Sequence, residues 1–164
     1  MFRPPCRKAV HSPIDRSSDI NFHITNKRLP LQTLNIIPKI REVDAFLCEH
    51  RPTGQVIREI HPEICFWALS TGRPMQYSKK KQEGFFEREK MLRSVYPKTE
   101  AIINEALTAY TRSEVAKDDI IDALAVAVTA QIGFNRFLTV PEIPPVDSMG
   151  LRMEMVYFPL EGVG

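Results

Sequence analysis

Apolar residues recur every three or four positions in several stretches of this chain, which is the spacing of helices that bury one face. The pattern predicts a helix over residues 31–50, in which Pro38 either kinks the axis or marks the true start. Further helices are predicted over residues 82–95, from 98 or 99 to about 112, and from 117 to about 133. The last of these carries the longest small and apolar run, so we expect it to be buried against a sheet.

Two other stretches alternate with period two and predict strands, over residues 55–63 and 151–158. Pro62 ends the first strand and begins a short apolar helix that reaches Leu69. Glu63 would then lie at the carboxyl edge of the strand, where open α/β sheets place their functional sites. Trp67, among apolar neighbours, is predicted to belong to the core. The proline-rich residues 140–145 predict an extended linker.

Residues 1–28 show no sustained period and are rich in proline, serine, arginine and histidine, which predicts an irregular segment. Residues 29–160 are expected to form the folded domain. His11, Asp15 and His23 lie in the irregular part at no ligand-like spacing, so we do not expect them to bind a metal.

The 164 residues suit one domain, and 43% hydrophobic residues are enough for a core. A net charge of +2 does not by itself indicate a nucleic-acid or membrane partner. The three cysteines, Cys6, Cys48 and Cys65, lie far apart and predict reduced thiols rather than a disulfide framework or a zinc site. No apolar run is as long as the roughly 18 residues of a membrane span, and no signal peptide is recognisable. We therefore expect a cytoplasmic protein without a membrane partner.

Three acids, Asp118, Asp119 and Asp122, open the helix over residues 117–133. Asp118 or Asp119 could cap the helix, but Asp122 lies one turn inside, where a cap is not needed. Asp119 and Asp122 are three positions apart, so they share one helical face and could share a divalent cation. The alternative is a solvated acidic start to an ordinary core helix.

Other charged residues also allow two interpretations. Lys79, Lys80 and Lys81 form a basic loop that could attract phosphate, or simply a solvated loop. Glu63 could be a site carboxylate, or a first-turn acid favoured by the helix dipole. The segment 87–90 (EREK) predicts an exposed face with salt bridges.

Six blocks of the sequence carry a resemblance: 37–44 (IPKIREVD), 61–63 (HPE), 66–69 (FWAL), 78–80 (SKK), 118–125 (DDIIDALA) and 150–154 (GLRME). Together they resemble a bacterial and archaeal family of unknown function that is described as predicted nucleases of the ribonuclease H fold. The chain is similar to this family over about residues 30–158, and the shorter pattern Asp-x-x-Asp-Ala-Leu-Ala is similar to the last helix of Holliday-junction resolvases.

The resemblance implies an α/β, ribonuclease H-like fold in which Glu63 is the acid of the middle of the sheet and Asp119 and Asp122 are the acids of the last helix, with Asp118 as an alternative. It implies that these residues are catalytic and bind Mg²⁺ or Mn²⁺, the ions that suit an all-carboxylate site. We expect the carboxylates of Glu63, Asp119 and Asp122 to converge. Lys79, Lys80 and Lys81 would contact a nucleic-acid substrate.

The chain departs from that fold at its start, because the fold's first strand carries an essential aspartate and no such strand precedes residue 30. The chain therefore resembles the C-terminal two-thirds of a family member, and we expect an incomplete sheet flanked by four or five helices. Exposed sheet edges would favour association with another copy.

The sequence thus predicts a divalent-metal-dependent nuclease that is truncated and weakly active. Two alternatives stay open: a non-catalytic binding or assembly domain that retains the scaffold, and an enzyme with another phosphoester substrate.

Overall fold

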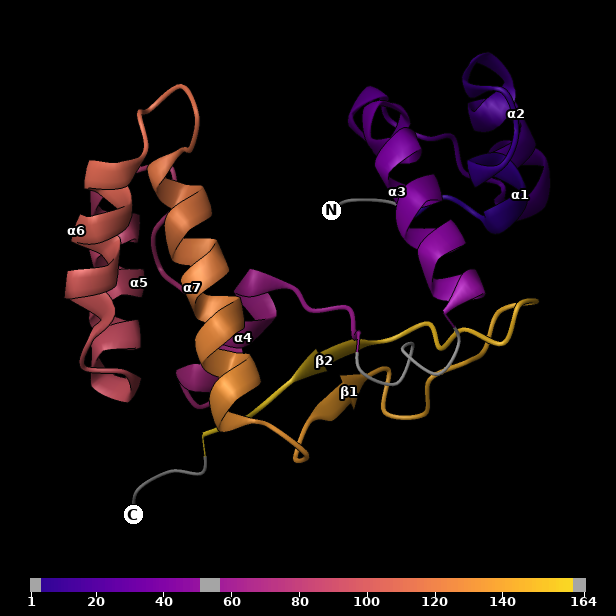
Figure 1. Ribbon diagram of the computed structural model, residues 1–164. Coiled ribbons are helices and arrows are strands. Elements are labelled where there is room, and N and C mark those ends of the chain that lie inside the picture. The colour runs from indigo at the N-terminus through magenta and orange to yellow at the C-terminus, as the bar shows by residue number, and fades with distance from the viewer. Residues whose placement is uncertain (1–3, 51–56, 161–164) are drawn as a thin grey trace. The chain divides into compact units, whose positions relative to one another are not determined.

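The computed structural model describes residues 4–50 and 57–160, which divide into two units, Met1–Ile57 and Arg58–Gly164 (Figure 1). Over these described residues the chain has seven helices and one two-stranded antiparallel sheet. The structure is therefore mostly helical, and the sheet of a ribonuclease H-like fold is not present in this part of the chain. The division after residue 57 also differs from the boundary expected near residue 28.

Unit 1 holds three helices, α1 (Arg7–Val10), α2 (Ile14–Thr25) and α3 (Leu31–Glu49). The predicted helix over residues 31–50 is confirmed, and it continues through Pro38. The prediction that residues 1–28 are irregular is wrong, because α1 and α2 lie there. The buried face of α2 consists of Ser17 and Asn21, whereas its large apolar side chains Phe22 and Ile24 are exposed. The spacing of apolar residues along the sequence therefore did not indicate this helix.

Asn21 replaces apolar contacts with hydrogen bonds at the centre of unit 1. Its side-chain oxygen accepts the backbone N–H of Cys6 at 2.8 Å, and its amide nitrogen donates to the carbonyl of Lys27 at 2.7 Å. Asn21 thereby ties α2 to the N-cap residue of α1 and to the loop that follows α2. A small apolar cluster of Ala9, Leu29 and Ile37 completes the core of this unit.

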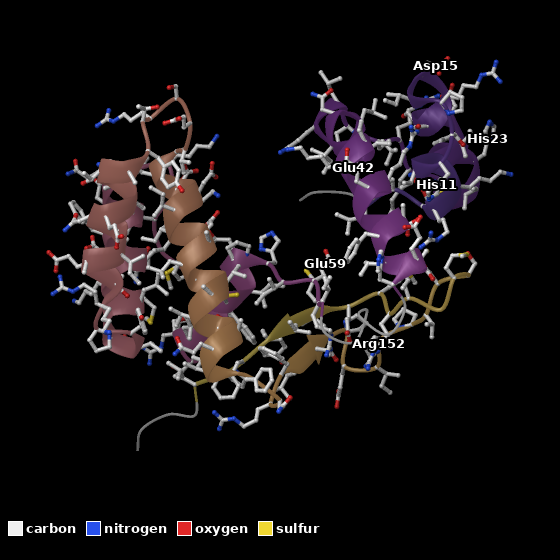
Figure 2. The ribbon with its side chains drawn as sticks, in the orientation of Figure 1. His11, Asp15, His23, Glu42, Glu59 and Arg152 are labelled. Carbon is white, nitrogen blue, oxygen red and sulfur yellow. The ribbon has the colours of Figure 1, made fainter. Side chains whose placement is uncertain are left out.

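Asp44 on α3 is the second polar link within unit 1. Its Oδ2 accepts from Arg7 Nη1 at 2.5 Å and lies 2.7 Å from His11 Nε2. Burial acts to raise the pKa of Asp44, but the hydrogen bonds from Arg7 and His11 outweigh it and hold the pKa below its usual value. In Figure 2 the side chains of His11, Asp15 and His23 lie at separate points around α1 and α2. The structure brings His11 to Asp44 instead.

Unit 2 is built around α7 (Lys117–Ile132), which contacts α4 (Pro62–Leu69), α5 (Gln82–Val95) and α6 (Thr99–Ala109). All four helices occur where the sequence predicts them, and Figure 1 shows α7 among the other three. The interior consists of side chains from all four: Cys65, Phe66, Leu69, Leu92, Ile103, Ile120, Ile121, Leu124, Ala125 and Val128.

The expected packing of α7 on a sheet is wrong, because α7 packs on helices. Ile121, Ala125 and Val128 are buried there, while Ala123, Ala127 and Ala130 are exposed. α7 is nevertheless part of the core, because it contributes half of the buried cluster of unit 2.

The sheet is small and lies beside α4. β1 (Leu138–Val140) pairs antiparallel with β2 (Met155–Tyr157), with Thr139 opposite Val156. β1 was not predicted, and its last residue falls in the predicted linker over residues 140–145; β2 is shorter than the predicted strand over residues 151–158. Of the strand predicted over residues 55–63, the part before residue 57 lies outside the described residues, and the rest reduces to one parallel bridge from Ile60 to Val156.

Trp67 does not belong to the core as predicted. Its side chain is 40% exposed, and its ring meets the edge of Tyr157 on β2 at a centroid distance of 5.8 Å. The prediction of reduced thiols is consistent with the structure, where Cys6, Cys48 and Cys65 are free.

The Asp44 cluster gives a pH-dependent prediction for unit 1. Replacing Asp44 with Asn should lower the free energy of unfolding at neutral pH by about 1–2 kcal/mol, because Arg7 and His11 lose a largely buried anionic partner. A carboxyl with a lowered pKa contributes its stability above its unfolded pKa of about 3.9 and loses it as the pH falls. The difference between parent and variant, measured by urea unfolding of the full chain, should therefore disappear between about pH 5 and about pH 2.

Asp19→Asn is the matched control, because the Asp19–Arg28 pair is 62% and 64% exposed and should contribute little. A difference for Asp44→Asn that stays constant down to the lowest pH would contradict the assignment.

Candidate functional site

The acids of α7 lie at its first two turns and do not cap it. The N-cap residue is Ala116, and no side chain accepts a capping hydrogen bond there. Asp118 and Asp122, four residues apart, face the same side of the helix, because both approach one ammonium group. Asp119 is exposed. The structure thus pairs Asp122 with Asp118 rather than with Asp119.

Lys79 supplies that ammonium group. Its Nζ lies 2.5 Å from Asp122 Oδ2 and 3.7 Å from Asp118 Oδ2. The hydrogen bond to Asp122, with the nearby charges of Asp122, Asp118 and Asp119, raises the pKa of Lys79 against the opposing effect of burial. A positive charge therefore lies between two carboxylates of one helix.

Asp122 is the most buried of the three acids. Its side chain is 17% exposed, and its second oxygen, Oδ1, is buried without a hydrogen-bond partner in the protein. A buried carboxylate oxygen without a partner is costly. Lys79 therefore satisfies one oxygen of Asp122, and the other stays buried without a hydrogen-bond partner in the protein.

Glu63 lies in the first turn of α4. His61 is the N-cap, and its Nδ1 accepts the backbone N–H of Glu63 at 3.2 Å. Both carboxylate oxygens of Glu63 accept from Arg88 Nη2, at 2.8 and 2.9 Å, and Nε of the same guanidinium lies 3.2 Å from Oε1. Glu63 is therefore the anionic partner of Arg88.

Arg88 lies on α5 and is almost fully buried, with its side chain 4% exposed. Its Nη1 donates to the carbonyls of Tyr77, at 2.9 Å, and Gly84, at 3.0 Å, so the bonds to these carbonyls and to Glu63 use all five N–H groups of the guanidinium. The group also lies 5.4 Å from the ring centroid of Phe66. These contacts compensate the buried charge.

The loop between α4 and α5 is held against α5 by two further contacts. The carboxylate of Glu87 accepts the backbone N–H groups of Gln76 and Tyr77, at 2.8 and 3.0 Å. At Gly84 the loop approaches so closely that a Cβ atom would lie 2.1 Å from the carbonyl oxygen of Ser78. The backbone on both sides of Tyr77 is thus fixed on α5. The backbone of Lys79, two residues later, is thereby held opposite α7.

A known family covers most of this chain. The family described as a protein of unknown function, DUF429, matches residues 1–144. The chain belongs to the DUF429 family. No curated protein and no solved structure matches it. The match includes the N-terminal helices, which lie outside the resembling region of residues 30–158, and stops before residues 150–154.

In this DUF429 protein the predicted site residues fall into two groups. Asp118 and Asp122 meet at Lys79, whereas Glu63 binds Arg88. Within residues 4–50 and 57–160, no three histidine, cysteine or acidic residues form a group that could hold a metal ion. Glu63, Asp119 and Asp122 therefore do not form a ready three-carboxylate centre. In the same ranges, no helix is long and apolar enough to cross a membrane.

Sequence reasoning missed the central role of Arg88. The segment 87–90 was predicted to be an exposed charged face, but Arg88 is buried and Glu87 binds the loop backbone. The available signal was Gly84, one turn before Arg88 on the same face of α5, because a glycine inside a helix often marks a close backbone approach. Lys80 and Lys81 are exposed, as a loop that could contact phosphate requires.

Part of the site fits a divalent cation. Asp118 and Asp122 supply carboxylate oxygens of the kind Mg²⁺ and Mn²⁺ prefer, they already surround one positive group, and Asp122 Oδ1 lacks a partner. Glu63 does not fit, because both its oxygens accept from a buried guanidinium. The set of residues that fits is smaller than the resemblance implies.

The Glu63–Arg88 pair gives a prediction about stability without any metal. Glu63→Ala would leave the buried guanidinium of Arg88 without its anion, and should lower the free energy of unfolding by about 2–3 kcal/mol. The measurement is urea unfolding in the presence of a chelator. Glu100→Ala is the control, because it removes an exposed partner of Arg93 and should cost less than about 1 kcal/mol. If Glu63→Ala were as stable as the parent, the ion pair between Glu63 and Arg88 would not stabilise the fold.

Proposed function

We propose that this DUF429 protein is a divalent-metal-dependent phosphodiesterase that acts on nucleic acid, with Asp118 and Asp122 as the residues that hold the ion. One observation carries the proposal: two carboxylates of α7 enclose a positive charge, and one buried oxygen of Asp122 has no partner. Metal-assisted hydrolysis needs side chains that hold the ion, and carboxylates suit Mg²⁺ or Mn²⁺.

The chemistry assigned to each residue follows from its position. A bound Mg²⁺ or Mn²⁺ would lower the pKa of a coordinated water and neutralise charge on the phosphate. Asp122 would hold the ion, and the burial of its side chain limits its conformational freedom. Asp118 supplies the second carboxylate, and the exposed Asp119 adds negative charge beside them.

The loop before α5 supplies the complementary positive charge. Lys80 and Lys81 are exposed next to Lys79, so they can attract a phosphate backbone. The proposed substrate is a nucleic acid because the chain resembles predicted nucleases and because this basic loop adjoins the acids. Glu63 acts indirectly in this proposal, since it holds Arg88 and thereby the loop.

A second candidate function is a non-catalytic assembly domain. It is favoured by the bond between Glu63 and Arg88, which removes a carboxylate from the expected centre. The side chains of Leu138 and Val140 on β1 are also 49% and 46% exposed, so this strand presents an apolar surface that a second copy could cover. A measurement of metal binding distinguishes the proposed phosphodiesterase from the assembly domain.

The test of the enzymatic proposal is a thermal melt with and without Mn²⁺, paired with cleavage assays on single-stranded, duplex and branched DNA and RNA. At ten times its dissociation constant, the ion should stabilise the parent by about 1.4 kcal/mol, a shift of roughly 3–6 °C for a domain of this size. Asp122→Asn should abolish the shift and any cleavage. Glu105→Gln, which removes an exposed acid from α6, should retain both.

Cleavage that survives Asp122→Asn would exclude this site as the catalytic one. A chain that shows neither a metal-dependent shift nor cleavage would instead support the assembly domain.

A further inference from the structure

Lys79 occupies the position that the proposed ion would take. Its ammonium lies between Asp118 and Asp122, 3.7 and 2.5 Å from their Oδ2 atoms. We propose that Lys79 is an internal counter-ion of this acid pair, which a divalent cation must displace in order to bind. The inference rests on the proposed function, because it concerns the same two carboxylates.

The acid pair needs such a counter-ion when no metal is bound. Two like charges four residues apart on a helix repel each other, and one of them here is largely buried. The Lys79 ammonium offsets that repulsion. Its charge-assisted hydrogen bond to Asp122 is of the stronger kind. A metal ion must therefore break this bond before it can occupy the same oxygen.

The loop makes Lys79 an effective competitor. Because the backbone on both sides of Tyr77 is fixed on α5 by Arg88 and Glu87, Lys79 is delivered to the acids without a large loss of chain freedom. A tethered group competes at a high effective concentration.

Lys79 can also leave without disturbing the fold. Its side chain is 33% exposed, so the flexible stem can move its ammonium into solvent while the backbone stays in place. Arg88 differs in this respect, because its side chain is 4% exposed and all its N–H groups are bonded. Lys79 is therefore the cation that can be displaced, and Arg88 is the one that remains.

The experiment is a Mn²⁺ titration by isothermal calorimetry and by electron paramagnetic resonance of free Mn²⁺, at constant ionic strength and without substrate. Lys79→Met should bind Mn²⁺ about tenfold more tightly than the parent, because one charge-assisted bond no longer has to be broken. Lys80→Met removes the same charge from the next position and should change the affinity less than about twofold. Lys79→Arg keeps the positive charge, so its affinity should lie closer to that of the parent than to that of Lys79→Met.

Circular dichroism of each variant checks that it is folded, and Asp122→Asn checks that the titration reports this site. If the parent binds Mn²⁺ through Asp122 and Lys79→Met binds no more tightly, the role of Lys79 is overturned while the metal site stands. If Lys79→Met and Lys80→Met strengthen binding equally, the effect is general charge and the role is again overturned. If neither the parent nor Lys79→Met binds Mn²⁺, the proposed function fails and the inference fails with it.

Discussion

The buried guanidinium of Arg88 is the interaction on which the arrangement of unit 2 depends. Placing a positive charge inside a protein is expensive unless every donor finds an acceptor and an opposite charge is near. Arg88 meets both conditions with Glu63 and with the carbonyls of Tyr77 and Gly84. Since these partners come from α4, α5 and the loop between them, satisfying one side chain fixes three segments.

This constraint determines how the acids of α7 are neutralised. The fixed loop holds Lys79 opposite Asp118 and Asp122, so the positive charge of one segment compensates the negative charge of another. Glu63 supports the loop through Arg88, to which both of its carboxylate oxygens are bonded. The resemblance to predicted nucleases implies that Glu63, Asp119 and Asp122 form one centre, whereas the structure brings Asp118 and Asp122 to Lys79 and brings Glu63 to Arg88.

Helices with an apolar stripe were predictable from the sequence, because α4, α5, α6 and α7 each contribute apolar side chains to the core of unit 2 and α3 contributes Ile37 to that of unit 1. α2 was not, since it buries Ser17 and Asn21 and leaves Phe22 exposed. The strand predicted before Pro62 forms only one bridge in the described residues, because alternation alone does not supply a pairing partner. At the site, the spacing paired Asp119 with Asp122, whereas the structure brings Asp118 and Asp122 together, and Arg88 was not identified. Arg88 has charged residues on both sides in the sequence, which favours the prediction of an exposed position. Its buried partners are known only from the fold.

The most direct test of this account is a double-mutant cycle between Glu63→Ala and Asp122→Asn, measured by urea unfolding of the metal-free protein. Glu63 pairs with Arg88 and Asp122 pairs with Lys79, and the clamped loop connects the two pairs in addition to the packing of α4 and α5 against α7. The account predicts that the two changes are coupled by at least about 0.5 kcal/mol, with the double variant less destabilised than the sum of the single variants. Free energies that add within about 0.3 kcal/mol would show that the two pairs are independent and would contradict the account.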